Sequence, residues 1–253
     1  MILIQTYTDL QTIAQHDPNI LALILVGSRG RDFAHTDSDW DCQMIVVDDV
    51  LDVYRQRFAN LPAEIELSID TLDGFRDHAA WGNEMAWDRY TWAHITPEID
   101  KTDSVLQPII DEKSRVPEEH VDAFIRGSLD HYINQVYRSI KCLRSGNDVG
   151  HRLEAAESIR PMLNALFCLH DRRVLPYYKY LAWDLAHYPL DKLDCSSEEL
   201  LHDILAIVEG GDCLVQQKWL RKVESLFRRE GYGDVFDAWE GKDQWTMNVV
   251  ISI

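Results

Sequence analysis

A chain of 253 residues, 46% of them hydrophobic, can bury one large core or two of ordinary size, which excludes a disordered protein. No apolar run approaches the roughly 20 residues that span a bilayer, and no basic segment precedes a long apolar stretch at the start, so we expect a cytoplasmic protein without a membrane partner. The five cysteines are odd in number and show no Cys-x-x-Cys spacing, which favours reduced thiols over disulfides or a zinc site.

Acidic residues dominate the charge of the chain, whose formal net charge is −18. Residues 1–110 carry 7 basic against 19 acidic side chains. Proteins that grip a phosphate backbone usually present a basic face, so we expect no nucleic-acid partner. Such a field attracts cationic molecules instead. An acidic surface that serves only solubility explains the charge equally well.

The first hundred residues are rich in strand patterns. A short amphipathic helix is expected over residues 6–19, with Thr8 and Gln11 as a capping box. Continuous apolar runs, or a strict alternation of apolar and polar residues, predict strands after it. The expected strands cover residues 20–26, 41–47, 63–70 and 91–96.

Beyond Pro117 the apolar residues recur at helical spacing. Helices are expected over residues 121–143, 151–170, 177–188, 196–211 and 212–231. The sequence therefore predicts an α+β protein, with an N-terminal mixed sheet flanked by helices and followed by an all-α helical bundle. We place the domains at residues 1–114 and 115–253.

The most informative motif is "GSRGRDFAHTDSDWD", residues 27–41, which joins the first two strands. Side chains two apart in a strand share a face, so Asp39 and Asp41 are expected to lie side by side and to repel each other unless a cation lies between them. Mg²⁺ prefers such oxygen ligands and leaves places for substrate phosphates. Gly27 lets the backbone approach a ligand, and the N–H groups that follow can bind phosphate oxygens.

This motif resembles the Gly-Ser…Asp-x-Asp signature of the nucleotidyltransferase superfamily, which includes DNA polymerase β. The eleven-residue step from Ser28 to Asp39 is similar to that of its antibiotic-modifying branch. The resemblance implies that Asp39 and Asp41 hold two Mg²⁺ ions. It also implies that the ATP triphosphate binds at Gly27 and Ser28, with Arg29 beside them. The acceptor hydroxyl then attacks the α-phosphorus and pyrophosphate leaves.

The resemblance also implies a third carboxylate from a later strand, which binds one metal ion or takes the proton of the attacking hydroxyl. "EIELSID" supplies Glu66 as the matching residue, with Asp70 on the same face as a second choice and Glu64 as a third. The alternative is that these carboxylates are the solvated side of an edge strand.

The helical half resembles that of the aminoglycoside nucleotidyltransferases. In "LPYYKYLAWDLAHYP" the order of proline, lysine and tryptophan makes Lys179 the residue expected to reach the ATP phosphates. Glu154 and Glu157, three apart on one helical face, are candidates to bind a cationic amine or to act as general base. A surface lysine and a solvated acidic pair are the alternatives.

Three functions remain open from the sequence. The first is Mg²⁺-dependent transfer of AMP from ATP to a hydroxyl of a small molecule, of which an aminoglycoside-like antibiotic is one example. The second is a protein AMP-transferase of toxin–antitoxin type. The third is a catalytically idle relative that binds nucleotide. The sequence does not define the acceptor, the nucleotide preference, the general base or the oligomeric state.

Overall fold

The computed structural model describes residues 4–250 and confirms the α+β class. The chain divides into two compact units, Met1–Val116 and Pro117–Ile253, which are described separately. The boundary expected from the sequence lay after residue 114. Unit 1 contains the sheet, and unit 2 is helical.

Unit 1 is built on a four-stranded sheet in the order β3-β2-β1-β4. The strands are β1 (Ile20–Leu25), β2 (Trp40–Val46), β3 (Ile65–Thr71) and β4 (Ile99–Asp100). β1 is antiparallel to both β2 and β4, whereas β2 and β3 are parallel, so the sheet is mixed as predicted. Parallel neighbours need a crossover connection, and the helix α2 lies in the segment between them.

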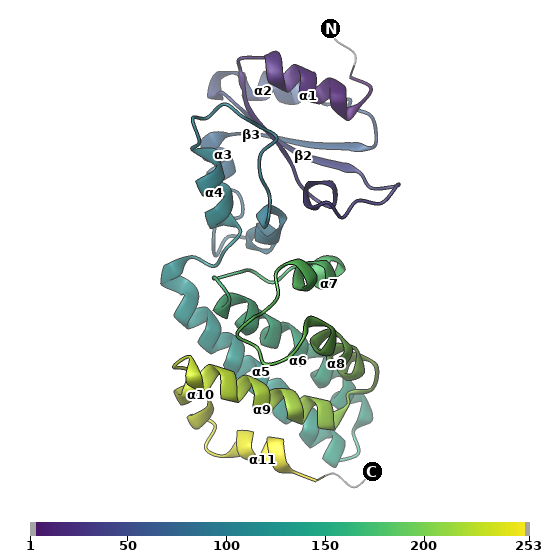
Figure 1. The fold of residues 1–253 in the computed structure, drawn as a ribbon, viewed down its shortest axis with the longest axis vertical. Coiled ribbons are helices and arrows are strands. Elements are labelled where there is room, and N and C mark those ends of the chain that lie inside the picture. Colours follow the sequence, from purple (N-terminus) through teal and green to yellow (C-terminus); the bar gives the residue numbers. More distant parts are fainter. Residues whose placement is uncertain (1–3, 251–253) are drawn as a thin grey trace. The chain divides into compact units, whose positions relative to one another are not determined.

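Helices cover both faces of this sheet (Figure 1). The helical elements of unit 1 are α1 (Tyr7–His16), η1 (Arg29–Arg31), η2 (Asp48–Val50), α2 (Leu51–Arg57), α3 (Leu72–Asp77), η3 (Ala86–Trp92) and α4 (Leu106–Lys113). One apolar core joins α1 and α2 to residues such as Leu23 and Met44. A second core joins α3, η3 and α4 to the opposite face, where Ile24 and Ile45 lie. Alternate residues of β1 and β2 thus serve different cores, and both strands read as continuous apolar runs.

Two local predictions for unit 1 were wrong. The capping box of α1 is formed by Thr6 and Asp9 rather than by Thr8 and Gln11, because the helix begins at Tyr7. The segment 91–96 is not a strand. The 3₁₀ helix η3 includes its first two residues, Thr91 and Trp92, and the fourth strand starts only at Ile99.

A buried arginine explains the loss of the expected strand. The Arg31 guanidinium donates to the carbonyl oxygens of Tyr90 (2.6 Å) and Thr91 (2.7 Å), so these carbonyls are not available to a neighbouring strand. Pro97, which has no N–H to donate, further limits pairing in this segment.

Unit 2 confirms the five predicted helices and adds short ones. Its helical elements are η4 (Glu118–His120), α5 (Val121–Arg144), α6 (Asp148–Leu169), α7 (Tyr178–His187), α8 (Ser197–Gly210), α9 (Cys213–Arg229), α10 (Gly233–Asp237) and α11 (Lys242–Asn248). The long helices α5 and α6 run side by side (Figure 1), and Pro161 lies within α6. The Ser196 hydroxyl caps α8, and Gly211, at φ +67°, ends it. Within residues 4–250, no helix is long and apolar enough to cross a membrane.

Candidate functional site

Gly27 brings the loop after β1 into contact with the start of β2. The Val26 N–H donates to the Asp41 carbonyl (2.8 Å), and the backbone then turns through φ +63° at Gly27. A Cβ added at Gly27 would lie 2.8 Å from Cγ of Asp41 and nearer still to its Oδ2. A glycine is needed here for both reasons, and its lack of a side chain lets the Asp41 carboxylate lie against the loop.

This loop leaves a run of hydrogen-bond donors free. Within the part of the chain that the structure describes, the backbone N–H groups of Gly27, Ser28 and Arg29 donate to no protein atom, and neither does the Ser28 hydroxyl. The Ser28 carbonyl, by contrast, accepts from the Phe33 N–H (2.9 Å) and closes the loop on itself. Successive free N–H groups at such a turn form a concave site for anions. The predicted phosphate site therefore has free donors at Gly27 and Ser28.

Arg31 holds this loop in place, a role that sequence reasoning missed. Its side chain is 4% exposed and donates to the Gly27 carbonyl (2.8 Å) as well as to the two carbonyls of η3. The loop is thus tied to a segment about sixty residues away in sequence. The only sequence signal was a second arginine in "GSRGR", which does not by itself distinguish a buried anchor from a surface cation.

Arg29 was expected to bind the nucleotide, but its guanidinium is bound to the motif itself. It donates through Nη2 to the Ser38 carbonyl (2.7 Å) and through Nε to the Asp39 carbonyl (3.1 Å). It also lies 4.1 Å from the centre of the Trp40 ring, which stacks on Tyr7 with 4.0 Å between ring centres. Arg29 therefore fixes the backbone that carries Asp39, while its backbone N–H donates to no atom of residues 4–250.

The parallel pairing of β2 and β3 sets the positions of the carboxylates. Asp41 and Glu66 are register partners, so their side chains leave the same face of the sheet from neighbouring strands. Asp39 lies two residues before Asp41, immediately ahead of the strand. Asp39 and Glu66 are exposed, and Asp41 is half-buried. Of the three acidic candidates near β3, Glu66 is thus the register partner of Asp41.

The three carboxylates are not gathered into a ready-made ligand set. Among residues 4–250, no three His, Cys, Asp or Glu side chains converge closely enough to hold a metal ion. Like charges repel, so exposed carboxylates such as Asp39 and Glu66 need a cation to draw them together. The three carboxylates supply the oxygen ligands that Mg²⁺ prefers, and their backbone positions are close to one another.

The other acidic candidates on β3 have different surroundings. Asp70 is paired with Arg55 (3.0 Å) and accepts from Gln43 (3.4 Å). It lies four positions along β3 from Glu66, which corresponds to about 13 Å at the usual rise of a strand. Glu64 is exposed just before β3, and its carbonyl accepts from the Trp40 N–H (2.8 Å).

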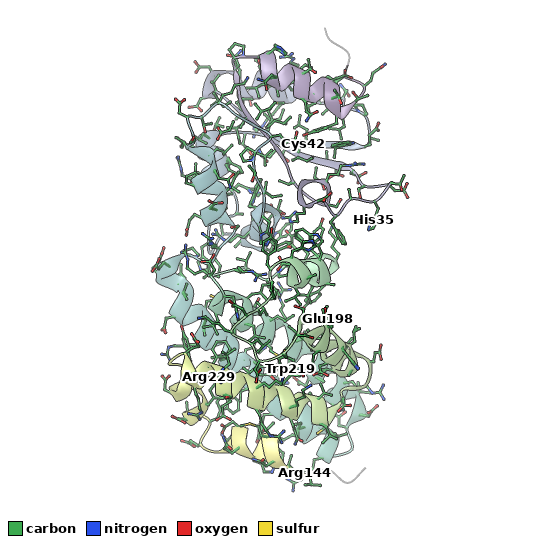
Figure 2. All side chains as sticks on the ribbon, in the orientation of Figure 1. His35, Cys42, Arg144, Glu198, Trp219 and Arg229 are labelled. Carbon is green, nitrogen blue, oxygen red and sulfur yellow. The ribbon has the colours of Figure 1, made fainter. Side chains whose placement is uncertain are left out.

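Cys42, on the sheet next to Asp41 (Figure 2), is not a nucleophile. Burial raises the pKa of its thiol to about 12, and the charge of Asp41 adds to the rise. The thiol therefore stays protonated at neutral pH, and a protonated thiol is a weak nucleophile. Its side chain belongs to the core under α1.

The candidates in unit 2 fall into two groups. Glu154 forms an ion pair with Arg138 of α5 (2.5 Å), so its charge is already neutralised. Glu157 is exposed and lines a hollow of about 360 Å³ together with Arg160. Lys179, the second residue of α7, is exposed and lies 4.8 Å from the centre of the Tyr180 ring.

Arg160 is a further cation that the sequence did not single out. Neither Arg160 nor Lys179 forms a hydrogen bond or ion pair with any residue the structure describes. Arg160 also acts on Tyr178, the residue before Lys179. Burial raises the pKa of Tyr178, and the charge of Arg160 partly offsets that rise. Among the described residues, unit 2 thus includes two cations that form no ion pair, Arg160 and Lys179, and Glu157 lies in the same hollow as Arg160.

Comparisons with known proteins found a structural likeness but no match in sequence. No family model matches the chain, and no curated protein matches it. Among solved structures, the chain is similar to the crystal structure of a nucleotidyltransferase-like protein from Exiguobacterium sibiricum 255-15, with a TM-score of 0.37 and 13% sequence identity. The match covers 88% of this chain and 77% of that one. A likeness this low assigns neither fold nor activity, which are argued from this chain's own residues.

Proposed function

We propose that unit 1 is a nucleotidyltransferase that moves AMP from ATP to a hydroxyl of a small molecule in a Mg²⁺-dependent reaction. The observation that carries the proposal is the run of free N–H groups at Gly27, Ser28 and Arg29, directly beside the Asp41 carboxylate. An anion site and a carboxylate are an unfavourable pair unless a cation lies between them. Nucleotidyl transfer needs both, because its catalysis is mainly positioning and charge neutralisation.

The residues present fit such a cation. Asp39, Asp41 and Glu66 would hold Mg²⁺, of which two ions are expected, and Asp41 and Glu66 are register partners on neighbouring strands. When bound, the metal supplies positive charge against the phosphate oxygens. Arg29 and Arg31 keep the backbone of the two loops fixed, so only the carboxylate side chains would have to move when the cation binds.

The chain's own residues then supply binding and proton transfer. The N–H groups of the loop hold phosphate oxygens of ATP. The acceptor hydroxyl oxygen forms a bond to the α-phosphorus, while the bond from that phosphorus to the bridging oxygen breaks and pyrophosphate leaves with the electron pair. The hydroxyl proton passes to a carboxylate, and Glu66 is the proposed acceptor because it is exposed and is the register partner of Asp41.

The acidity of unit 1 supports a cationic acceptor. With 7 basic and 19 acidic residues in its first 110 positions, the unit attracts positively charged molecules and repels nucleic acids. An aminoglycoside-like compound has the required hydroxyls and amines. In unit 2, Glu157 remains a candidate to bind an amine, whereas Glu154 is already paired with Arg138.

Labelled ATP provides the test. The full chain is incubated with Mg²⁺ and ATP labelled at the α-phosphate, together with a panel of hydroxylated amines, and the label is followed into small molecules and protein. We expect label in a small-molecule product and release of pyrophosphate. Label in protein would support the AMP-transferase alternative, and tight ATP binding without transfer to any acceptor would support the idle relative. Either result would overturn the proposal.

The variant Asp39→Asn tests the role of the carboxylates. We expect it to lower turnover at least about 100-fold, because charge neutralisation at the phosphates is lost. The fold should persist, since Asp39 is exposed and its loss relieves repulsion. Asp49→Asn, an exposed carboxylate beyond the other end of β2, is the matched control. Wild-type turnover in Asp39→Asn would refute the metal assignment.

A further inference from the structure

A second hollow lies within unit 2, between the last turns of α5 and the start of α11. Its volume is about 360 Å³. Figure 2 shows Arg144 beside α11 at this end of the unit. The residues that matter for its chemistry are Tyr137, Lys141, Arg144, Glu240, Lys242 and Trp245.

Three cations line this hollow without partners. Within residues 4–250, Lys141, Arg144 and Lys242 form no hydrogen bond through their side chains and no ion pair. Arg138, one turn before Lys141 on α5, is paired with Glu154. The lining of the hollow therefore carries three cations against one carboxylate, Glu240.

Two aromatic rings form a wall of the hollow. Tyr137 and Trp245 meet edge to face, with 5.7 Å between ring centres and 74° between planes. Lys141 Nζ lies 5.2 Å from the Tyr137 ring centre, and Arg144 Cζ lies 5.7 Å from that of Trp245. Both rings are half-buried, so each keeps part of its surface open. Such a wall can stack against a flat ring of a ligand.

Compensation of a helix dipole does not account for this arrangement. Cations in the last turn of a helix are favourable, which explains Lys141 and Arg144 at the end of α5. It does not explain Lys242, which belongs to α11, or the aromatic wall. Cations from two separate helices that converge beside aromatic rings indicate a ligand with both negative charge and a flat ring.

We propose that this hollow binds a nucleoside phosphate as a second ligand site, separate from the phosphate loop of unit 1. Its phosphate lies against Lys141, Arg144 and Lys242, and its base stacks on Trp245. Glu240 is the single carboxylate of the lining and accepts hydrogen bonds from sugar hydroxyls or base amino groups, which inorganic phosphate lacks. The volume falls in the range of small-molecule sites. The net charge of −18 disfavours a long polyanion.

Binding of AMP to the full chain tests the proposal by titration calorimetry. AMP should bind, and the double variant Lys141→Ala/Lys242→Ala should weaken its binding about 100-fold, since each charged hydrogen bond contributes about a factor of ten. The matched control is Arg152→Ala/Arg229→Ala, which removes the same charge from exposed positions elsewhere in unit 2. Equal affinity in the two double variants would overturn the site.

Further measurements separate the ligand classes. Trp245→Ala should weaken AMP several-fold more than inorganic phosphate, whereas Trp245→Phe should retain AMP binding because it keeps a ring. Phosphate that binds as tightly as AMP would overturn the nucleoside part of the proposal. Single-stranded RNA that binds more tightly than AMP would overturn the commitment to a small ligand.

The inference stands apart from the proposed transfer reaction. Gly27→Ala alters the loop of unit 1 and should leave AMP binding at the hollow unchanged. Lack of transfer activity together with AMP binding that depends on Lys141 and Lys242 would refute the proposed function and support this site. Transfer activity together with AMP binding that does not depend on these two residues would support the proposed function and refute this site.

Discussion

Substituting Gly27 tests the geometry on which the proposed chemistry depends. In Gly27→Ala the new Cβ would lie 2.8 Å from Cγ of Asp41, whereas ordinary van der Waals contact begins near 3.4 Å. It would lie nearer still to Oδ2 of the same carboxylate. The Asp41 carboxylate or the loop must therefore move by roughly 1 Å. A displacement of this size between reacting groups lowers a rate by about 100-fold.

The same substitution has a smaller effect on folding. An L-residue in the left-handed region costs about 1–2 kcal/mol relative to glycine, and Gly27 has φ +63°. For a domain of about 100 residues, each kcal/mol corresponds to a fall in Tm of about 4–8 °C. Unit 1 should therefore remain folded at room temperature while its activity is largely lost.

Gly82→Ala is the matched control for this prediction. Gly82 also lies in unit 1 and has φ +84°, but an added Cβ would meet no atom within 4 Å. Both variants carry backbone strain, and only Gly27→Ala carries the clash. Turnover, ATP affinity and Tm are measured for both. Equal turnover in the two variants would show that the contact between Gly27 and Asp41 has no part in catalysis.

Two further predictions concern Arg29, which binds the backbone at Ser38 and Asp39, and the buried Lys113. Arg29→Ala should lower kcat about tenfold with little change in KM for ATP, because Arg29 holds the Asp39 backbone. Arg29→Lys should restore little of the activity, since lysine lacks the planar guanidinium that binds two carbonyls at once. Steady-state kinetics against Arg76→Ala, an exposed arginine, check this, and a rise in KM alone would indicate a phosphate ligand. Burial lowers the pKa of Lys113 to about 8 from 10.5. Between pH 8 and 10.5 the unfolded chain therefore binds more protons than the folded one. The contribution of Lys113 to the unfolding free energy rises with pH over this range, by about 3 kcal/mol. The difference in unfolding free energy between wild type and Lys113→Met, measured from pH 7 to 11, should show this rise, because the opposite contribution of Cys42 is common to both proteins and cancels. A flat difference would contradict the prediction.

The elements that bury continuous apolar runs were predictable from the sequence. β1 and β2 contribute to cores on both faces of the sheet, so their apolar residues needed no alternation to be recognised. The long helices of unit 2 repeat their buried residues at helical spacing. In each case the local sequence pattern and the tertiary packing favour the same secondary structure.

The parts that failed depend on contacts between distant residues. The segment 91–96 has strand-forming residues, but Arg31 binds the carbonyls just before and at its start. The role of Arg29 was also hidden, because its acceptors are backbone carbonyls that any residue would provide at Ser38 and Asp39. An arginine that binds backbone and one that binds phosphate are identical in sequence.

The position of Glu66 depends on the register of the sheet as well as on the motif. The motif pointed to it through the order of residues, and the one-to-one pairing of β2 with β3 makes it the register partner of Asp41. A shift of one residue in that pairing would turn Glu66 to the other face and bring Leu67 or Ile65 to the carboxylates. The apolar residues Ile65 and Ile69 are buried in the core under α1 and α2, so such a shift is costly. Core packing thus fixes the register, and the register places the third acidic group beside Asp41.

The two phosphate sites proposed for this chain differ in the origin of their positive charge. The loop of unit 1 offers neutral N–H donors next to Asp41, so a nucleotide there gains net attraction only when a divalent cation offsets the carboxylates. The hollow of unit 2 offers Lys141, Arg144 and Lys242 against one carboxylate, so its attraction needs no added cation. Mg²⁺ that pairs with the phosphate in solution competes with these cations. If both proposed sites bind nucleotide, Mg²⁺ should therefore strengthen binding at the first site and weaken it at the second, a difference that follows from charge alone.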